Sequence, residues 1–187
     1  MNALTATLCK QPILGVVMWL SFMCGSNQAI QGSPNIDLST RGEVLAQKIS
    51  VPMDEGYRFS LTFYFDSWGA YNKPGPAGEP SMSNHPACKS RMDYDNLPSA
   101  TKEKLGADIQ LQIDITSLEG QPVASKTFTS RCVTSWGDKT KSRTDLNEPI
   151  QLKKGSYRLS IKNLAPIHVP SDTNVQPILH GSGVGFP

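Results

Sequence analysis

Strict alternation of apolar and polar residues is the feature that most constrains the fold of this sequence. In residues 107–116 (ADIQLQIDIT), isoleucine and leucine alternate with aspartate and glutamine, and residues 57–65 (YRFSLTFYF) alternate in the same way. Because successive side chains of extended backbone point to opposite faces, both segments predict strands that bury one face. The expected inward residues are Ile109, Leu111, Ile113 and Ile115 in the first strand and Tyr57, Phe59, Leu61, Phe63 and Phe65 in the second, with Arg58, Ser60 and Thr62 facing solvent.

Neighbouring segments predict partners for these two strands. Residues 44–51 (VLAQKISV) are apolar and β-branched, and we expect them to pair with residues 57–65 through a turn at 52–56 (PMDEG). After residues 107–116, the turn SLEGQP leads to VASKTFTS at 123–130, the expected antiparallel neighbour.

The C-terminal part continues the same pattern. Residues 149–164 (PIQLKKGSYRLSIKNL) predict a strand, a glycine-containing turn and a second strand with Tyr157, Leu159 and Ile161 inward. A last strand is expected at 175–179, where Pro177 favours a sheet edge, or at 184–186. The expected fold class is therefore all-β: an antiparallel β-sandwich of about seven strands, with one long irregular loop and little helix.

The long irregular loop is expected at residues 67–106. It is rich in proline and has no sustained periodicity, apart from a short predicted helix at 99–105 that has Ser99 as its N-cap and ends at Gly106. The loop is either a tethered surface excursion or a binding loop. As a binding loop it would present Trp68, Tyr71 and Tyr94, and Trp136 is a fourth candidate for partner binding.

The N-terminal residues predict export. Residues 1–29 contain Lys10 and no acidic residue, followed by an apolar run at 12–24, which is typical of a secretory signal peptide and too short for a membrane span. We expect a flexible segment at 30–42, a β-sandwich domain at 43–187 and a periplasmic or secreted protein without a transmembrane span. Phe22 and Met23 are large for the positions before a lipid-attachment cysteine, so Cys24 is expected to leave with the signal; a lipoprotein anchored at Cys24 is the alternative.

Removal of the signal would leave two cysteines, Cys88 and Cys132. In an oxidising compartment an even number of cysteines favours a disulfide between them. Free thiols remain an alternative. A zinc site that includes His85 is another, although a single His-x-x-Cys pair is weak evidence for zinc.

No sequence motif indicates an enzyme, a cofactor or a metal. The formal net charge of +2 lacks the basic excess of a nucleic-acid-binding domain. The glycine-rich segment 180–185 (HGSGVG) has the wrong spacing for a nucleophile elbow and no helix after it to bind phosphate. The basic run 138–143 (DKTKSR), with Lys153 and Lys154, is expected at solvated hairpin tips, or else at an acidic partner.

The order of YRFSLTFYF, a long polar loop, LGADIQLQIDI and IQLKKGSYRLSIKNL resembles a group of small exported bacterial proteins. Those proteins combine a signal peptide, often a lipoprotein one, with a single β-sandwich domain. The resemblance covers residues 43–167, and the element LKKGSYRL anchors it. It implies that some members are periplasmic immunity proteins that neutralise secreted antibacterial toxins, with cell-wall-degrading enzymes as the expected toxin class. It assigns no role to any individual residue.

Two classes of function follow from the sequence. In the first, the chain is an immunity protein that binds a cognate toxin. In the second, it is a carbohydrate- or peptidoglycan-binding module whose aromatic side chains stack on sugar rings.

Overall fold

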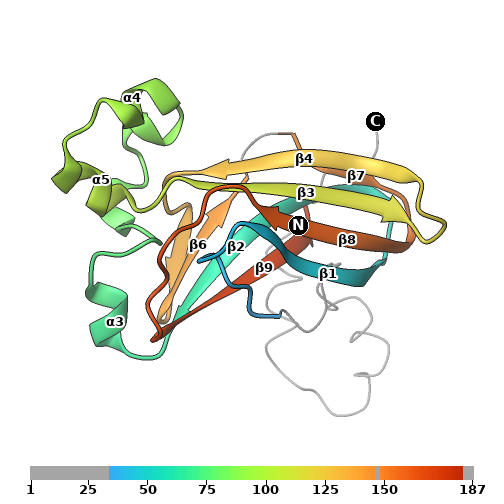
Figure 1. Cartoon of the computed structure of the whole chain (residues 1–187), viewed down its shortest axis with the longest axis horizontal. Coiled ribbons are helices and arrows are strands. Elements are labelled where there is room, and N and C mark those ends of the chain that lie inside the picture. Colours follow the sequence, from blue (N-terminus) through green and yellow to red (C-terminus); the bar gives the residue numbers. More distant parts are fainter. Residues whose placement is uncertain (1–33, 146–147, 183–187) are drawn as a thin grey trace, which may run out of the picture.

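Two antiparallel β-sheets pack face to face, and short helices gather at one end of them (Figure 1). The computed structural model describes residues 34–145 and 148–182. Their strands are β1 (Gly42–Val51), β2 (Glu55–Phe65), β3 (Ile109–Ser117), β4 (Pro122–Ser130), β5 (Ser135–Gly137), β6 (Thr140–Thr144), β7 (Ile150–Leu152), β8 (Gly155–Asn163) and β9 (Thr173–Gly181). The first sheet has the order β1-β8-β3-β4, and the second has β5-β6-β2-β7 with β9 also paired to β2. The predicted all-β sandwich is thus confirmed, with nine strands in the described residues where about seven were expected.

The core lies between the two sheets. All the residues predicted to face inward from β2 and β3 are buried, and so are Leu159 and Ile161 of β8, whereas Tyr157 is half-buried. An edge-to-face contact between Phe59 and Phe128, with ring centroids 5.0 Å apart, joins the sheets across the core. Alternation in two segments therefore identified the centre of the core.

The outer face of β2 differs from the prediction. Ser60 and Thr62 are buried rather than solvated. Each hydroxyl bonds to a hydroxyl on β6: Ser60 Oγ donates to Thr144 Oγ1 at 3.0 Å, and Thr62 Oγ1 lies 2.8 Å from Ser142 Oγ. Alternation therefore predicted the face on which these two side chains lie but not their accessibility to solvent.

The predicted pairing of β1 with β2 is wrong. β1 pairs with β8, from Gly42 opposite Asn163 to Val51 opposite Gly155, in the other sheet from β2. The short link between β1 and β2 crosses from one sheet to the other, as does the link between β7 and β8. The two links are joined where Lys154 donates its backbone N–H to Asp54 Oδ1 at 2.5 Å.

Strand β9 lies at an edge, where it pairs with β2 alone among the described strands. This confirms the first of the two predicted positions and explains how Pro177, which has no N–H, fits into a strand. The alternative position, 184–186, lies outside the described residues.

The segment predicted as an irregular loop is a helical insert, defined here as residues 66–108. It contains α3 (Trp68–Asn72), η1 (Pro80–Met82), η2 (Pro86–Cys88), α4 (Arg91–Asp95) and α5 (Ser99–Leu105). The bounds predicted for α5 are confirmed, but its N-cap is Pro98 rather than Ser99, and Gly106 ends it with a φ of +94°. In Figure 1 the labelled helices of the insert lie together beyond one end of the strands.

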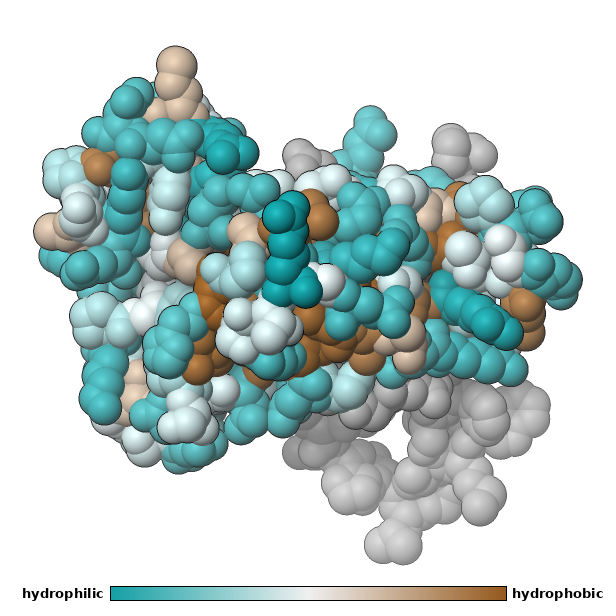
Figure 2. Space-filling view, viewed as in Figure 1, coloured by the Kyte–Doolittle hydropathy of each residue, from teal (hydrophilic) through white to brown (hydrophobic). Residues whose placement is uncertain are grey.

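Apolar surface gathers on one face of the sandwich. Figure 2 shows a band of apolar residues across the middle of this face, whereas the helical end is mostly hydrophilic. Half-buried Val44, Leu45, Ile167 and Val169 pack against the core from β1 and from the link between β8 and β9.

The predicted signal peptide, Cys24 and residues 30–33 of the predicted flexible segment lie outside the described residues, whereas Ile36 and Leu38 of that segment are described and buried. Within residues 34–145 and 148–182, none of the helices has the length and apolar character that a membrane crossing requires.

Candidate functional site

A buried arginine fixes the helical insert to the second sheet. Arg143 of β6 has no exposed surface, and its guanidinium donates hydrogen bonds to four backbone carbonyls. The acceptors are Ala77 (3.0 Å), Ala107 (2.6 Å) and Leu105 (3.1 Å) in the insert, together with Ser130 (3.0 Å) at the end of β4. Burial lowers the pKa of Arg143 to about 9, so the side chain is still charged at neutral pH.

A second basic residue of β6 attaches α3. Lys141 is buried and donates Nζ to the carbonyl of Tyr71 at 2.8 Å. The same Nζ lies 4.6 Å from the Tyr71 ring centroid and 5.1 Å from that of Phe65, within reach of cation–π attraction. Burial lowers the pKa of Lys141.

These contacts correct the interpretation of the run 138–143. Lys141 and Arg143 are neither at a solvated hairpin tip nor free for an acidic partner, because both point under the insert. Asp138 is exposed at the turn between β5 and β6, and Lys153 and Lys154 are exposed as expected.

Three of the four predicted aromatic contact residues lie at this end of the sandwich. Trp68 and Tyr71 lie on α3, where their rings pack edge to face with centroids 5.3 Å apart, and Tyr71 packs in the same way on Phe65. Trp136 lies on β5 directly opposite Lys141 of β6, so these two side chains share a face. We call Trp68, Tyr71 and Trp136 the aromatic surface.

The tryptophans of the aromatic surface are open to solvent. Trp68 exposes 55% of its surface and Trp136 exposes 53%. Hydrogen bonds hold the backbone that carries both tryptophans. Ser67 Oγ caps α3 by accepting from the N–H of Ala70 at 3.1 Å. The turn after β5 is joined to β2, because Phe65 N–H donates to Lys139 O at 3.0 Å. The aromatic surface therefore consists of large side chains whose backbone is held in place by hydrogen bonds.

Tyr94, the fourth predicted contact residue, is not part of this surface. Its hydroxyl donates to the Gly106 carbonyl at 3.0 Å, and the cationic groups of Lys102 and Arg131 lie 5.7 and 5.8 Å from its ring centroid. Burial, followed by the charge of Asp108, raises the pKa of Tyr94. Its contacts are those of a residue that holds α4 against α5.

A disulfide joins Cys88 of η2 to Cys132, which follows β4, as expected from the sequence. Each sulfur is bonded to the other, so the alternatives of free thiols and of a zinc site with these two ligands are wrong. The described residues contain no cluster of His, Cys, Asp and Glu that could hold a metal ion.

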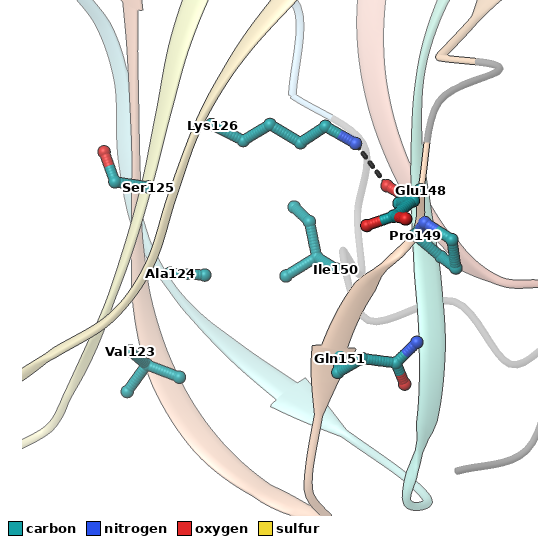
Figure 3. Close-up of a pocket in the computed structure, with 8 residues that line it drawn as sticks. All are labelled: Val123, Ala124, Ser125, Lys126, Glu148, Pro149, Ile150 and Gln151. Atoms are coloured by element: carbon teal, nitrogen blue, oxygen red, sulfur yellow. Dashed lines mark hydrogen bonds between the residues drawn. The ribbon is translucent and has the colours of Figure 1, made fainter. Parts of the chain in front are cut away.

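Elsewhere, a gap of about 640 Å³ separates the edge strands β4 and β7, which belong to different sheets (Figure 3). Lys126 spans the gap, donates to the backbone carbonyl of Glu148 and lies with Nζ 2.8 Å from Asp145 Oδ2. The apolar residues that line the gap are Val123, Ala124 and Ile150. The lysine therefore connects the sheets where their strands diverge.

The glycine-rich segment 180–185 begins within β9. His180 lies on this strand, where burial and the nearby charge of Arg58 lower its pKa. Ser182 continues the pairing by donating its N–H to Gly56 O at 2.7 Å. Residues 183–185 lie outside the described part of the chain.

Fold and contacts together define a β-sandwich protein with a helical insert that presents an aromatic surface. The family described as a domain of unknown function (DUF5625) matches residues 34–179, and the chain belongs to this family.

A similar solved structure is the crystal structure of a protein from Sulfurospirillum deleyianum. It has a TM-score of 0.50 and 16% sequence identity, with 81% of this chain and 96% of that chain covered. At this identity the likeness shows a shared fold. No curated protein matches the sequence.

Sequence reasoning missed Lys141 and Arg143 as structural residues. The sequence pattern that could have identified them is TKSRT, in which basic residues alternate with serine and threonine. In a strand, this alternation places Lys141 and Arg143 on the same face. Charged residues on an inward face break the usual pattern, so the segment was interpreted as a surface turn instead.

Proposed function

We propose that this chain is an exported immunity protein that binds and neutralises a secreted antibacterial toxin, with a cell-wall-targeting enzyme as the expected toxin class. The observation that carries the proposal is the aromatic surface, on which two tryptophans leave more than half of their area exposed. Export is supported by the disulfide, since disulfides persist in oxidising compartments.

Exposed tryptophans suit a protein interface. Tryptophan, tyrosine and arginine supply most of the affinity in protein–protein interfaces, and they do so from the centre of the contact. Trp68 and Trp136 come from separate elements that Lys141 and Phe65 hold together, so little conformational freedom would be lost on binding. An interface centred here would bury both indole rings.

The alternative is a carbohydrate- or peptidoglycan-binding module of the cell envelope. It rests on the same rings, because exposed aromatic faces also stack on sugars. The two proposals differ in partner rather than in surface, and one set of variants tests both.

The test is co-expression with the product of the neighbouring gene, exported to the periplasm. Under the proposal, that product stops growth when expressed alone, and the wild-type chain restores growth. Because truncation of a central aromatic costs about 2 kcal/mol or more, Trp68→Ala and Trp136→Ala should each weaken the complex about 30-fold or more. Both side chains are half exposed, so urea unfolding of the variants should match the wild type.

Met92→Ala is the matched control, because Met92 is 72% exposed and lies on α4, outside the aromatic surface. It should leave growth and complex formation unchanged. A neighbouring product that is harmless without this chain, or that forms no complex with it, contradicts the immunity function. Retention of the chain on purified peptidoglycan that is lost in both tryptophan variants supports the alternative.

A further inference from the structure

A pocket of about 660 Å³ lies between the insert and the segment that follows β4. Its insert wall includes His85, Cys88 and Lys89, and its opposite wall includes Arg131 and Cys132. The disulfide thus joins the two walls. No residue of the aromatic surface lines this pocket.

Arg131 is the unusual residue of the pocket. It is only 8% exposed, and its Nε lies 3.1 Å from Asp108 Oδ1. The guanidinium also stacks over the Tyr94 ring at 5.8 Å. Its two terminal nitrogens have no hydrogen-bond partner among the described residues. These nitrogens are therefore available to a ligand in the pocket, and hydrogen bonds from a charged donor to an anionic acceptor are stronger than those between neutral groups.

Two further donors line the pocket beside Arg131. His85 Nδ1 accepts from the N–H of Ala87 at 3.2 Å, so in the neutral ring the proton is on Nε2, which makes Nε2 a donor. Lys89 is exposed and has no ion-pair partner among the described residues.

The acidic groups nearby are already paired. Asp145 lines the pocket, but its carboxylate lies 2.8 Å from Lys126 Nζ, and Asp108 is paired with Arg131 itself. The charge of Lys89 is therefore not cancelled locally. Hydroxyl groups of Ser83, Ser130 and Thr134 add neutral polar atoms to the lining.

We propose that this pocket binds a small ligand through an oxyanion group, a carboxylate or a phosphate. The free terminal nitrogens of Arg131 form a planar fork that matches two oxygens of either group, and Lys89 and His85 supply further donors. The proposal stands whether or not the aromatic surface binds a toxin, since the two sites share no residue.

The test uses the oxidised protein at low ionic strength, with inorganic phosphate and N-acetyl-alanyl-alanine as separate probes. Amide chemical shifts should move at residues 83–89 and 129–134 at millimolar concentrations of at least one probe, and the probe that binds identifies the oxyanion. Lys89→Met should weaken this probe about three- to tenfold, because it removes one charged donor. Arg131→Lys keeps the charge beside Asp108 but lacks the fork, and it should weaken binding about tenfold or more.

Lys104→Met is the control, because Lys104 is an exposed lysine of the same insert that does not line the pocket. It should leave the affinity unchanged. The proposal is overturned if neither probe shifts the pocket residues, or if Lys104→Met weakens binding as much as Lys89→Met. The Lys89 side chain is exposed and makes no hydrogen bond or ion pair with the described residues, so its variant remains informative even where Arg131→Lys is unstable.

Discussion

At the scale of single residues, Arg143 attaches the insert through hydrogen bonds from its buried guanidinium. Replacing it with leucine removes the donors to four backbone carbonyls. Because buried acceptors without partners are costly, Arg143→Leu should lower the free energy of unfolding by about 3–5 kcal/mol. Urea unfolding followed by circular dichroism measures this change. Arg143→Lys keeps the charge but not the fork of donors, and it should be intermediate.

The matched control is Arg158→Leu, at an exposed arginine on β8. A surface substitution of this kind should change the free energy of unfolding by no more than about 0.5 kcal/mol. Equal losses in Arg143→Leu and Arg158→Leu would contradict the role given to the buried guanidinium.

At the scale of elements, the disulfide determines the stability of the insert. Cys88 and Cys132 are 44 residues apart in sequence, and a cross-link over this distance lowers the entropy of the unfolded chain. The double variant Cys88→Ser/Cys132→Ser should therefore lose about 4 kcal/mol of unfolding free energy. Trypsin should also cut it faster after Arg91, an exposed residue of α4 just beyond the cross-link.

Urea unfolding and timed digestion check the disulfide prediction, and wild-type protein in a reducing agent should reproduce both effects. A double variant that unfolds at the same urea concentration as the oxidised protein, and is cut no faster, would contradict it.

How far the sequence predicted the elements depended on their length. β2 and β3 are long enough for alternation to identify them, and α5 carries a glycine at its end. The other helices of the insert have five residues or fewer, too short for a helical period to be visible. β6 was missed because Lys141 and Arg143 occupy its inward face.

The pairing of the strands and the composition of the aromatic surface could not be predicted from the sequence. The link between β1 and β2 is as short as a hairpin turn, and nothing in its local sequence distinguishes a hairpin from a crossing between sheets. Trp68 and Trp136 are far apart in sequence, and they lie at the same end of the sandwich because α3 and the turn after β5 both attach to the end of β2. Aromatic type alone could not separate them from Tyr94, whose hydroxyl and ring are used inside the insert.

At the scale of the whole molecule, three polar contacts connect segments that are not joined by packing in the apolar core. Asp54 and Lys154 join the two crossing links, and Arg143 joins the insert to the second sheet. Lys126 joins β4 of the first sheet to the segment between β6 and β7 in the second (Figure 3). The third contact is at the diverging edge of the sandwich, where strands of the two sheets leave a gap.

The contact of Lys126 should therefore stabilise the sandwich as a whole. Lys126→Met keeps the aliphatic stem but leaves the Asp145 carboxylate, which is 4% exposed, without its lysine. We expect a loss of about 1–3 kcal/mol in the free energy of unfolding, since a buried carboxylate loses its ion-pair partner. Lys48→Met is the control, because Lys48 is exposed on β1 and should change the free energy by no more than about 0.5 kcal/mol. Urea unfolding of both variants measures the difference. A Lys126→Met protein as stable as Lys48→Met would mean that the apolar core alone keeps the two sheets together.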